Sequence, residues 1–128
     1  MRTIKFRAKN INGVWYYGCL VYSNELDAAI YFQTGNGSVK VMDWVYVNKE
    51  TVGQFTGLYD CEGEEIFEGD ILDFNGLKVE VRFVRGVFAF LVNGNLDDKL
   101  CGDCRTDLFA KVIGNVYENP DILKGGEQ

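Results

Sequence analysis

The chain has 128 residues, which is enough for one domain or for two small subdomains that share a core. Its formal net charge of −6 disfavours binding to phosphate backbones, and the absence of histidine excludes Ser–His and Cys–His catalytic dyads. Four cysteines are too few for a disulfide-rich chain of this length, so we expect free thiols. We also expect no cofactor.

The N-terminal segment MRTIKFRAKN has no apolar run of signal-peptide length, and no stretch of the chain is long and apolar enough to span a membrane. We therefore expect a cytoplasmic protein of a bacterial host cell, with no membrane partner. Within this segment Ile4 and Phe6 alternate with Lys5 and Arg7, which predicts a half-buried strand.

Strand signals continue through the first half of the chain. Asn12-Gly13 predicts a two-residue hairpin turn, because both positions accept positive φ. The run VWYYGCLVY that follows is rich in β-branched and aromatic residues and predicts a second strand. SNELDAA predicts no more than one helical turn, and IYFQ and VKVM predict short strands on either side of the glycine-rich turn TGNGS.

The second half has a clearer strand pattern. ILDFNGLKVEVRFVRGVFAFLVNG contains strands separated by the turn pairs Asn75-Gly76, Arg85-Gly86 and Asn93-Gly94. The strand of residues 77–84 alternates apolar and charged side chains, as a half-buried antiparallel strand does. The next, GVFAFLVN, is apolar on both faces and should be central or covered. A last strand, LFAKVIGNVY, ends before the Asn119-Pro120 step.

Short strands joined by tight turns predict a mainly β fold with little helix. We expect a small SH3-like barrel or a strongly curved antiparallel sheet, with additional N-terminal strands. The expected organisation is an N-terminal β subdomain (1–51), a small barrel-like subdomain (52–118) and a C-terminal tail (119–128).

The segment GQFTGLYDCEGEEIFEGDIL, residues 53–72, concentrates acidic side chains around a predicted hairpin. A three-residue loop with Gly63 in the left-handed region would place Asp60 opposite Glu64 and Leu58 beside Ile66 on one face. The acids would then gather at a solvated tip. In EGD, residues 68–70, the glycine allows a corner and Asp70 can accept a main-chain hydrogen bond.

A metal site in this segment has little support from the spacing. Counted from Asp60 as position 1 of a calcium loop, glycine falls at position 4 instead of position 6. A non-standard Mg²⁺ or Ca²⁺ site and a hydrolytic carboxylate pair stay open as alternatives. Cys101 and Cys104 form a lone CxxC and are weak metal candidates, because a structural zinc site needs four ligands. Two thiols in a loop explain them as well.

Two surfaces are candidates for binding. Lys78, Arg82 and Arg85 suggest a basic stripe, but Glu80 interrupts it, which favours a solvated sheet face over a nucleic-acid site. Exposed tryptophan and tyrosine are typical of interfaces. The candidate interface residues are Trp15, Tyr17, Trp44 and Tyr46.

Four stretches in order, IKFRA, VWYYG, TVGQFTGLYDCEGEEIFEGDIL and VIGNVYENPDIL, resemble the YopX family of phage and prophage proteins over essentially the whole chain. Lys9, where the family often has an aromatic, and Cys61-Glu62 in the turn depart from its pattern. The resemblance implies a small β-rich protein with no assigned catalytic activity. Its matched positions read as fold-defining turns and corners: Gln54, Thr56, Gly57, Asp60, Gly63, Glu68, Gly69 and Asp70.

From these observations we expect a non-enzymatic, phage-encoded module that binds a protein partner, either a second copy, with a homo-oligomer as the result, or a phage or host protein. Nucleic acid is a less favoured partner. The alternatives are a nucleic-acid-associated small-barrel module, an acidic mimic of DNA that regulates a host protein, and an enzyme or metal protein using the acidic tip or the CxxC.

Overall fold

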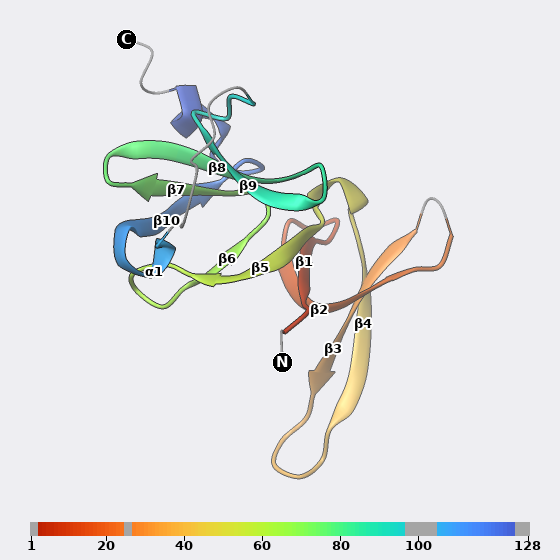
Figure 1. The fold of residues 1–128 in the computed structure, drawn as a ribbon. Coiled ribbons are helices and arrows are strands. Elements are labelled where there is room, and N and C mark those ends of the chain that lie inside the picture. Colours follow the sequence, from red (N-terminus) through yellow and green to blue (C-terminus); the bar gives the residue numbers. More distant parts are fainter. Residues whose placement is uncertain (1–2, 25–26, 97–104, 125–128) are drawn as a thin grey trace. The chain divides into compact units, whose positions relative to one another are not determined.

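A computed structural model describes residues 3–24, 27–96 and 105–124, and these residues form a mainly β protein (Figure 1). The helical elements among them are short: α1 (Thr106–Phe109) and the 3-10 turns η1 (Lys49–Thr51) and η2 (Pro120–Lys124). The chain divides into two compact units, which we call the N-terminal unit (1–55) and the C-terminal unit (56–128). Strand β5 (Gly53–Tyr59) begins in the first and ends in the second.

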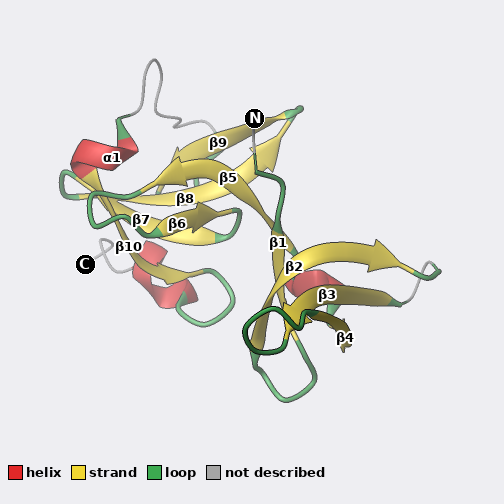
Figure 2. Ribbon diagram, turned by 90° about the horizontal axis from the view of Figure 1, so that it is seen from below, coloured by secondary structure: helices red, strands yellow, loops and turns green. Residues whose placement is uncertain are grey.

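The N-terminal unit is an antiparallel sheet of consecutive strands in the order β4-β3-β2-β1, visible in Figure 2. Its strands are β1 (Phe6–Lys9), β2 (Trp15–Tyr22), β3 (Ala28–Thr34) and β4 (Val41–Val47). The start of β5 pairs with β1 through Phe6↔Gln54 and Arg7↔Gly53.

The predicted turn at Asn12-Gly13 is one residue too short. Asn10 N–H bonds to Val14 O at 2.9 Å and Gly13 alone has positive φ (79°), so the loop contains three residues. The reason is Asn10, whose Oδ1 accepts the N–H groups of Asn12 (3.0 Å) and Val14 (2.9 Å). This side-chain bond stabilises the longer loop.

Strand β2 changes partner at Gly18. Residues 15–18 pair with β1, and residues 19–22 pair with β3. A Cβ at Gly18 would lie 2.2 Å from the main-chain oxygen of Tyr31, so the backbones approach more closely here than any side chain allows.

The C-terminal unit contains an antiparallel sheet in the order β10-β7-β8-β9 and the hairpin made by the end of β5 with β6 (Glu65–Phe67). The sheet strands are β7 (Asp70–Phe74), β8 (Leu77–Val84), β9 (Val87–Val92) and β10 (Ala110–Asn115). Asn75-Gly76 and Arg85-Gly86 have positive φ at both positions, which confirms the predicted two-residue turns.

The strands described in the C-terminal unit do not close into the small barrel expected over residues 52–118. Strands β9 and β10 instead end an open sheet, and its two faces are covered differently. One face contributes to a core with Ile66 from β6, and η2 packs against β8. Strand β9 is therefore an edge strand, yet Phe90 and Leu91 on its opposite faces are both buried.

Candidate functional site

The strand register of the N-terminal unit brings five aromatic side chains to one face of its sheet. Cross-strand partners share a face, and the pairs Lys9↔Trp15, Cys19↔Tyr31 and Tyr31↔Trp44 connect β1 to β4. We call this surface the aromatic face; it consists of Trp15, Tyr17, Tyr31, Trp44 and Tyr46. The four candidate interface residues thus lie together, and Tyr31 joins them. The sequence did not single out Tyr31, because its place depends on the pairing of β3 with β4.

Three rings of the aromatic face pack against one another. Tyr31 and Trp44 are stacked with centroids 6.1 Å apart, and Tyr46 meets Trp44 edge-on at 4.8 Å. Tyr17, Trp44 and Tyr46 are each about half exposed, at 47%, 46% and 57%. The face therefore presents large apolar area in a pre-ordered arrangement.

Trp15 differs from the other rings because two cations cover it. The Arg7 guanidinium lies 4.7 Å from the centroid of the Trp15 ring, and Lys9 Nζ lies at 5.5 Å. Both distances are within the range of cation–π attraction. Trp15 is half-buried, so it contributes less open surface than the sequence suggested.

The opposite face of the same sheet is the core of the N-terminal unit. Ala8, Ala28 and Ile30 are fully or almost fully buried there, and Tyr16 contacts Phe32 with ring centroids 5.3 Å apart. Tyr16 and Tyr17 therefore point to opposite sides, as the alternation along β2 predicts.

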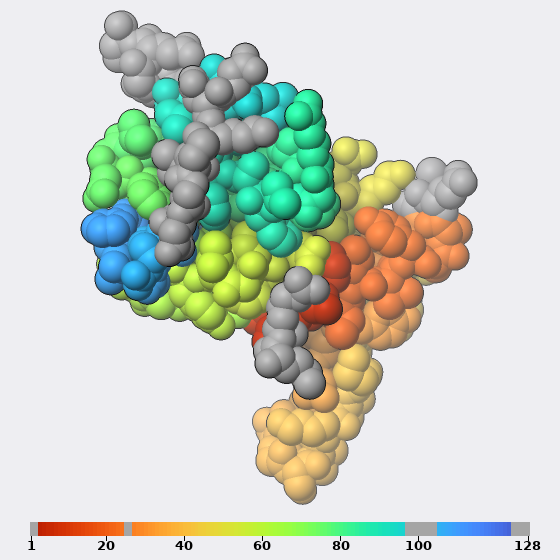
Figure 3. All heavy atoms as spheres, viewed as in Figure 1, coloured from red at the N-terminus to blue at the C-terminus, as the bar shows by residue number. Residues whose placement is uncertain are grey.

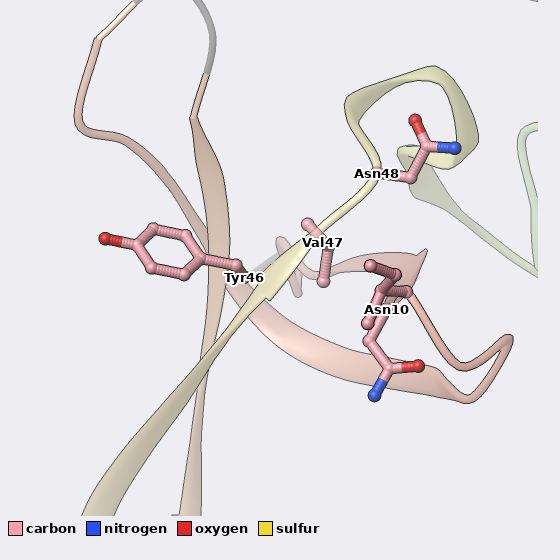
Figure 4. Close-up of a pocket in the computed structure, with 5 residues that line it drawn as sticks. Asn10, Tyr46, Val47 and Asn48 are labelled. Carbon is pink, nitrogen blue, oxygen red and sulfur yellow. The ribbon is translucent and has the colours of Figure 1, made fainter.

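An open depression of about 420 Å³ lies at the end of β4, where Val47 and Asn10 lie near each other and the Tyr46 ring extends to the other side of the strand (Figure 4). Two asparagines that line it are turn residues: Asn10 Oδ1 holds the β1–β2 loop, and Asn48 Oδ1 accepts the N–H of Glu50 at 3.0 Å. The other lining residues are Ile11, whose side chain is 97% exposed, and Val47. These lining side chains carry no acid or base, so the depression offers shape and apolar contact.

The structure turns Asp60 inward, away from the solvated tip at which the sequence placed it. Its Oδ1 accepts the N–H groups of Glu62 (2.9 Å) and Glu64 (2.8 Å), and its Oδ2 accepts that of Val112 (2.9 Å). Burial raises the pKa of this carboxyl, but the N–H donors of Val112, Glu64 and Glu62, with the charge of Lys111, outweigh it and hold the pKa below its ordinary value. Asp60 is a structural anchor that ties the hairpin to β10.

The expected three-residue loop with Gly63 in the left-handed region is present: Asp60 N–H bonds to Glu64 O at 2.9 Å, and Gly63 has φ 82°. Further along, the expected contact of Leu58 with Ile66 is altered by the positive φ of Gly57 (87°). The hydroxyl of Thr56 accepts from Leu58 N–H (3.1 Å) and donates to Ile66 O (2.8 Å), so it bridges the two strands. Leu58 is 38% exposed while Ile66 is fully buried.

The remaining motif residues lie at the start of β5, where it pairs with β1, and at the corner before β7. Gln54 pairs with Phe6, and Glu68 is half-buried beside the corner. Gly69 has φ 95°, its N–H bonds to Val81 O (2.8 Å) and its carbonyl accepts from Val116 N–H (2.9 Å). Asp70 is buried and accepts the N–H of Phe67 at 2.7 Å, as the sequence predicted.

Cys101 and Cys104 lie outside the described residues. Within the part of the chain that is described, no three His, Cys, Asp or Glu side chains gather as metal ligands do, and Cys19 and Cys61 are exposed free thiols. None of the helices described is long and apolar enough to cross a membrane.

Comparison with known proteins gives a family and a fold. The family model described as YopX protein matches residues 5–124. No curated protein matches the chain. Among solved structures, the chain is similar to the crystal structure of protein EF1440 from Enterococcus faecalis, with 24% sequence identity and a TM-score of 0.64 over 96% of this chain and 99% of that one. At this identity the likeness concerns the fold alone.

Proposed function

The chain belongs to the YopX protein family, and we propose that it is a non-enzymatic module, encoded by a phage or prophage, that binds a protein partner in the cytoplasm of the host cell. The observation that supports this proposal is the aromatic face of the N-terminal unit. Three of its rings are about half exposed on one sheet whose other face is core. Exposed tryptophan and tyrosine in a cluster are typical of the buried centre of protein interfaces.

The geometry also lowers the entropic cost of binding. Tyr31, Trp44 and Tyr46 already restrict each other's rotamers through ring contacts in the unbound chain. Less side-chain freedom is then lost when a partner covers them. The depression at the end of β4 has an apolar rim formed by Ile11, and a side chain of the partner can enter the depression.

The proposal is tested by capture of partners from phage-infected or prophage-induced host cells with matched variants. Tyr17→Ser and Trp44→Ser remove exposed rings from the aromatic face, whereas the control Val87→Ser removes an exposed apolar side chain from β9 in the C-terminal unit. We expect both face variants to lose the specifically captured protein and the control to keep it. Equal capture by all three variants contradicts the proposal.

A second candidate ligand of the same face is single-stranded nucleic acid. Lys9 stands beside Trp15 and near the exposed ring of Tyr17, and rings next to cations are typical of single-strand binding sites. The N-terminal unit also has six basic and four acidic residues, against seven and fifteen in the C-terminal unit. Anisotropy of labelled single-stranded oligonucleotides at rising salt discriminates the candidates: salt-dependent binding supports this one, and no binding at low salt removes it.

A further inference from the structure

Among the strands that the structure describes, β4 ends the sheet of the N-terminal unit, and alternate main-chain groups point to its free edge. Ser23 N–H bonds to Asp27 O at 3.0 Å, which fixes the alternation of hydrogen bonds between β2 and β3. By the register of β3 with β4, the odd-numbered residues of β4 bond to β3. The N–H and C=O groups of Met42, Trp44 and Tyr46 therefore face the free edge.

This edge has few of the features that keep edge strands from pairing. Its sequence, VMDWVYV, contains no proline, glycine or lysine and a single charged residue, Asp43. Met42 is 54% exposed, and Trp44 and Tyr46 lie on the same face. The end of the β3–β4 hairpin projects from the rest of its unit in the space-filling view (Figure 3). A seven-residue apolar edge of this kind is a template for another strand.

We infer that β4 pairs with β4 of a second copy of this chain, in antiparallel orientation about Trp44. The inference rests on the proposed function, because it names the partner and the contact. A two-fold contact requires a strand that is complementary to itself. Centred on Trp44, the pairing opposes Met42 to Tyr46 and Asp43 to Val45, so no two like charges meet. It also joins the aromatic faces of both copies into one surface.

The neighbouring registers are less favourable. Pairing centred on Asp43 places two carboxylates directly opposite each other, which destabilises a strand pair. Pairing centred on Val45 opposes Met42 to Asn48, but Asn48 N–H already bonds to Lys9 O at 2.8 Å. The register about Trp44 uses only main-chain groups that face the free edge.

Asp43 opposes this pairing in the isolated chain. Its Oδ1 accepts the N–H of Trp44 at 2.8 Å. This N–H group lies at the centre of the proposed pairing, so it is already bonded in the isolated chain. A second strand has to displace the carboxylate. The two-fold pairing frees one Trp44 N–H in each copy, so we expect Asp43→Val to raise the association constant by roughly two- to tenfold for each of the two main-chain hydrogen bonds, about 4- to 100-fold in all.

The register is tested with four double variants in sedimentation velocity over a concentration series. M42K/Y46E and M42E/Y46K place opposite charges across the pair, and M42K/Y46K and M42E/Y46E place like charges there. We expect both like-charged variants to associate about tenfold more weakly than both opposite-charged variants, from two cross-strand pairs. Circular dichroism verifies that all four are folded. Equal association of the four variants overturns the inference.

A cross-link gives an independent readout of the same register. Residues opposed in a hydrogen-bonded antiparallel pair have Cα atoms about 5.5 Å apart, within disulfide range. With the four native cysteines replaced by serine, Trp44→Cys should oxidise to a covalent dimer, and Tyr46→Cys, which faces Met42, should not. Absence of a Trp44→Cys dimer, with Asp43→Val monomeric at every concentration, overturns the inference. Loss of partner capture by Tyr17→Ser would still support the proposed function in that case.

Discussion

Two aspartates of the segment of residues 53–72, Asp60 and Asp70, accept main-chain hydrogen bonds that explain why an aspartate stands at each position. Asp60 accepts three N–H groups, two from its own hairpin and one from β10, 52 residues further along the chain. Asp70 accepts one at the corner before β7. Both are buried, and a buried carboxylate is tolerated only when such donors replace water. The other acids of residues 53–72 are the exposed Glu62 and Glu64 and the half-buried Glu65 and Glu68.

We expect Asp60→Asn to lower the free energy of unfolding by about 2–3 kcal/mol, because the neutral amide weakens charge-assisted bonds and brings an unmatched donor. Urea unfolding followed by circular dichroism measures this change. The matched control is Glu62→Gln at the exposed tip of the same hairpin, which should change stability by less than about 0.5 kcal/mol. Equal effects of the two substitutions would argue against the anchoring role.

The lowered pKa of Asp60 has a consequence for acid stability. The folded pKa lies below the ordinary value of 3.8, so the ionised group stabilises the fold at any pH above about 4. This stabilisation is lost as the pH falls through the folded pKa, where the native state must also take up the proton. The stability of Asp60→Asn should therefore fall less steeply than that of the wild type below pH 4.

At the scale of elements, two strand pairings depend on a glycine, for different reasons. At Gly18, β2 changes partner and the carbonyl of Tyr31 occupies the place of a side chain. At Gly57, β5 has a positive φ of 87°, and the hydroxyl of the preceding Thr56 bridges to β6. Gly18 is needed because of the close backbone approach, whereas Gly57 is needed because its positive φ is strained for other residues.

Gly18→Ala should destabilise the N-terminal unit by about 2–3 kcal/mol, because the new Cβ would meet a main-chain oxygen that only a backbone shift can move. Both tryptophans, Trp15 and Trp44, lie in this unit, so tryptophan fluorescence during urea unfolding reports on it selectively. Cys19→Ala at the adjacent exposed position is the control and should be nearly neutral. A Gly18→Ala midpoint like that of the control would contradict the close approach.

Thr56→Val removes the bridging hydroxyl without changing the shape of the side chain. The Leu58 N–H and the Ile66 C=O then lose their shared partner, which should cost about 1–2 kcal/mol. Thr56→Ser keeps the hydroxyl and should lose less. Unfolding midpoints by circular dichroism rank the two, and a serine variant as unstable as the valine variant would show that the methyl group matters more.

At the scale of the whole molecule, charge is divided unevenly. The N-terminal unit has six basic and four acidic residues, a formal charge of +2. The C-terminal unit has seven basic and fifteen acidic residues, a formal charge of −8. Like charges repel within a compact unit, and the repulsion weakens as salt shortens the screening length.

Salt should therefore stabilise the C-terminal unit more than the N-terminal unit. Raising the ionic strength from about 0.01 M to about 1 M shortens the Debye length from about 30 Å to about 3 Å. We expect the thermal midpoint seen by circular dichroism to rise by more than the midpoint seen by tryptophan fluorescence. Glu64→Lys lowers the negative charge of the C-terminal unit and should reduce this gain. An equal rise for both signals would contradict the charge argument.

The sequence by itself determined most of the turns and the approximate place of most strands. It missed some strand bounds: Leu108 and Phe109, predicted in the last strand, are helical, and Ala28, predicted in a helical turn, begins β3. Asn75-Gly76, Arg85-Gly86 and the loop ending at Gly63 adopt the expected positive φ, because the conformational freedom of glycine and asparagine acts locally. The family resemblance was likewise readable from local motifs, and the family model matches. The turn predicted at Asn12-Gly13 is present but one residue longer, because the side chain of Asn10 accepts two N–H groups of the loop.

Only the tertiary structure decided how those strands are combined. Four features depend on the register between strands. They are the open sheet in place of a barrel, the inward turn of Asp60, the free edge of β4, and the aromatic face, on which Tyr31 joins Trp15, Tyr17, Trp44 and Tyr46. Register is set by pairings between distant residues and by the burial of whole faces, and a period-two pattern in one strand does not specify its partner.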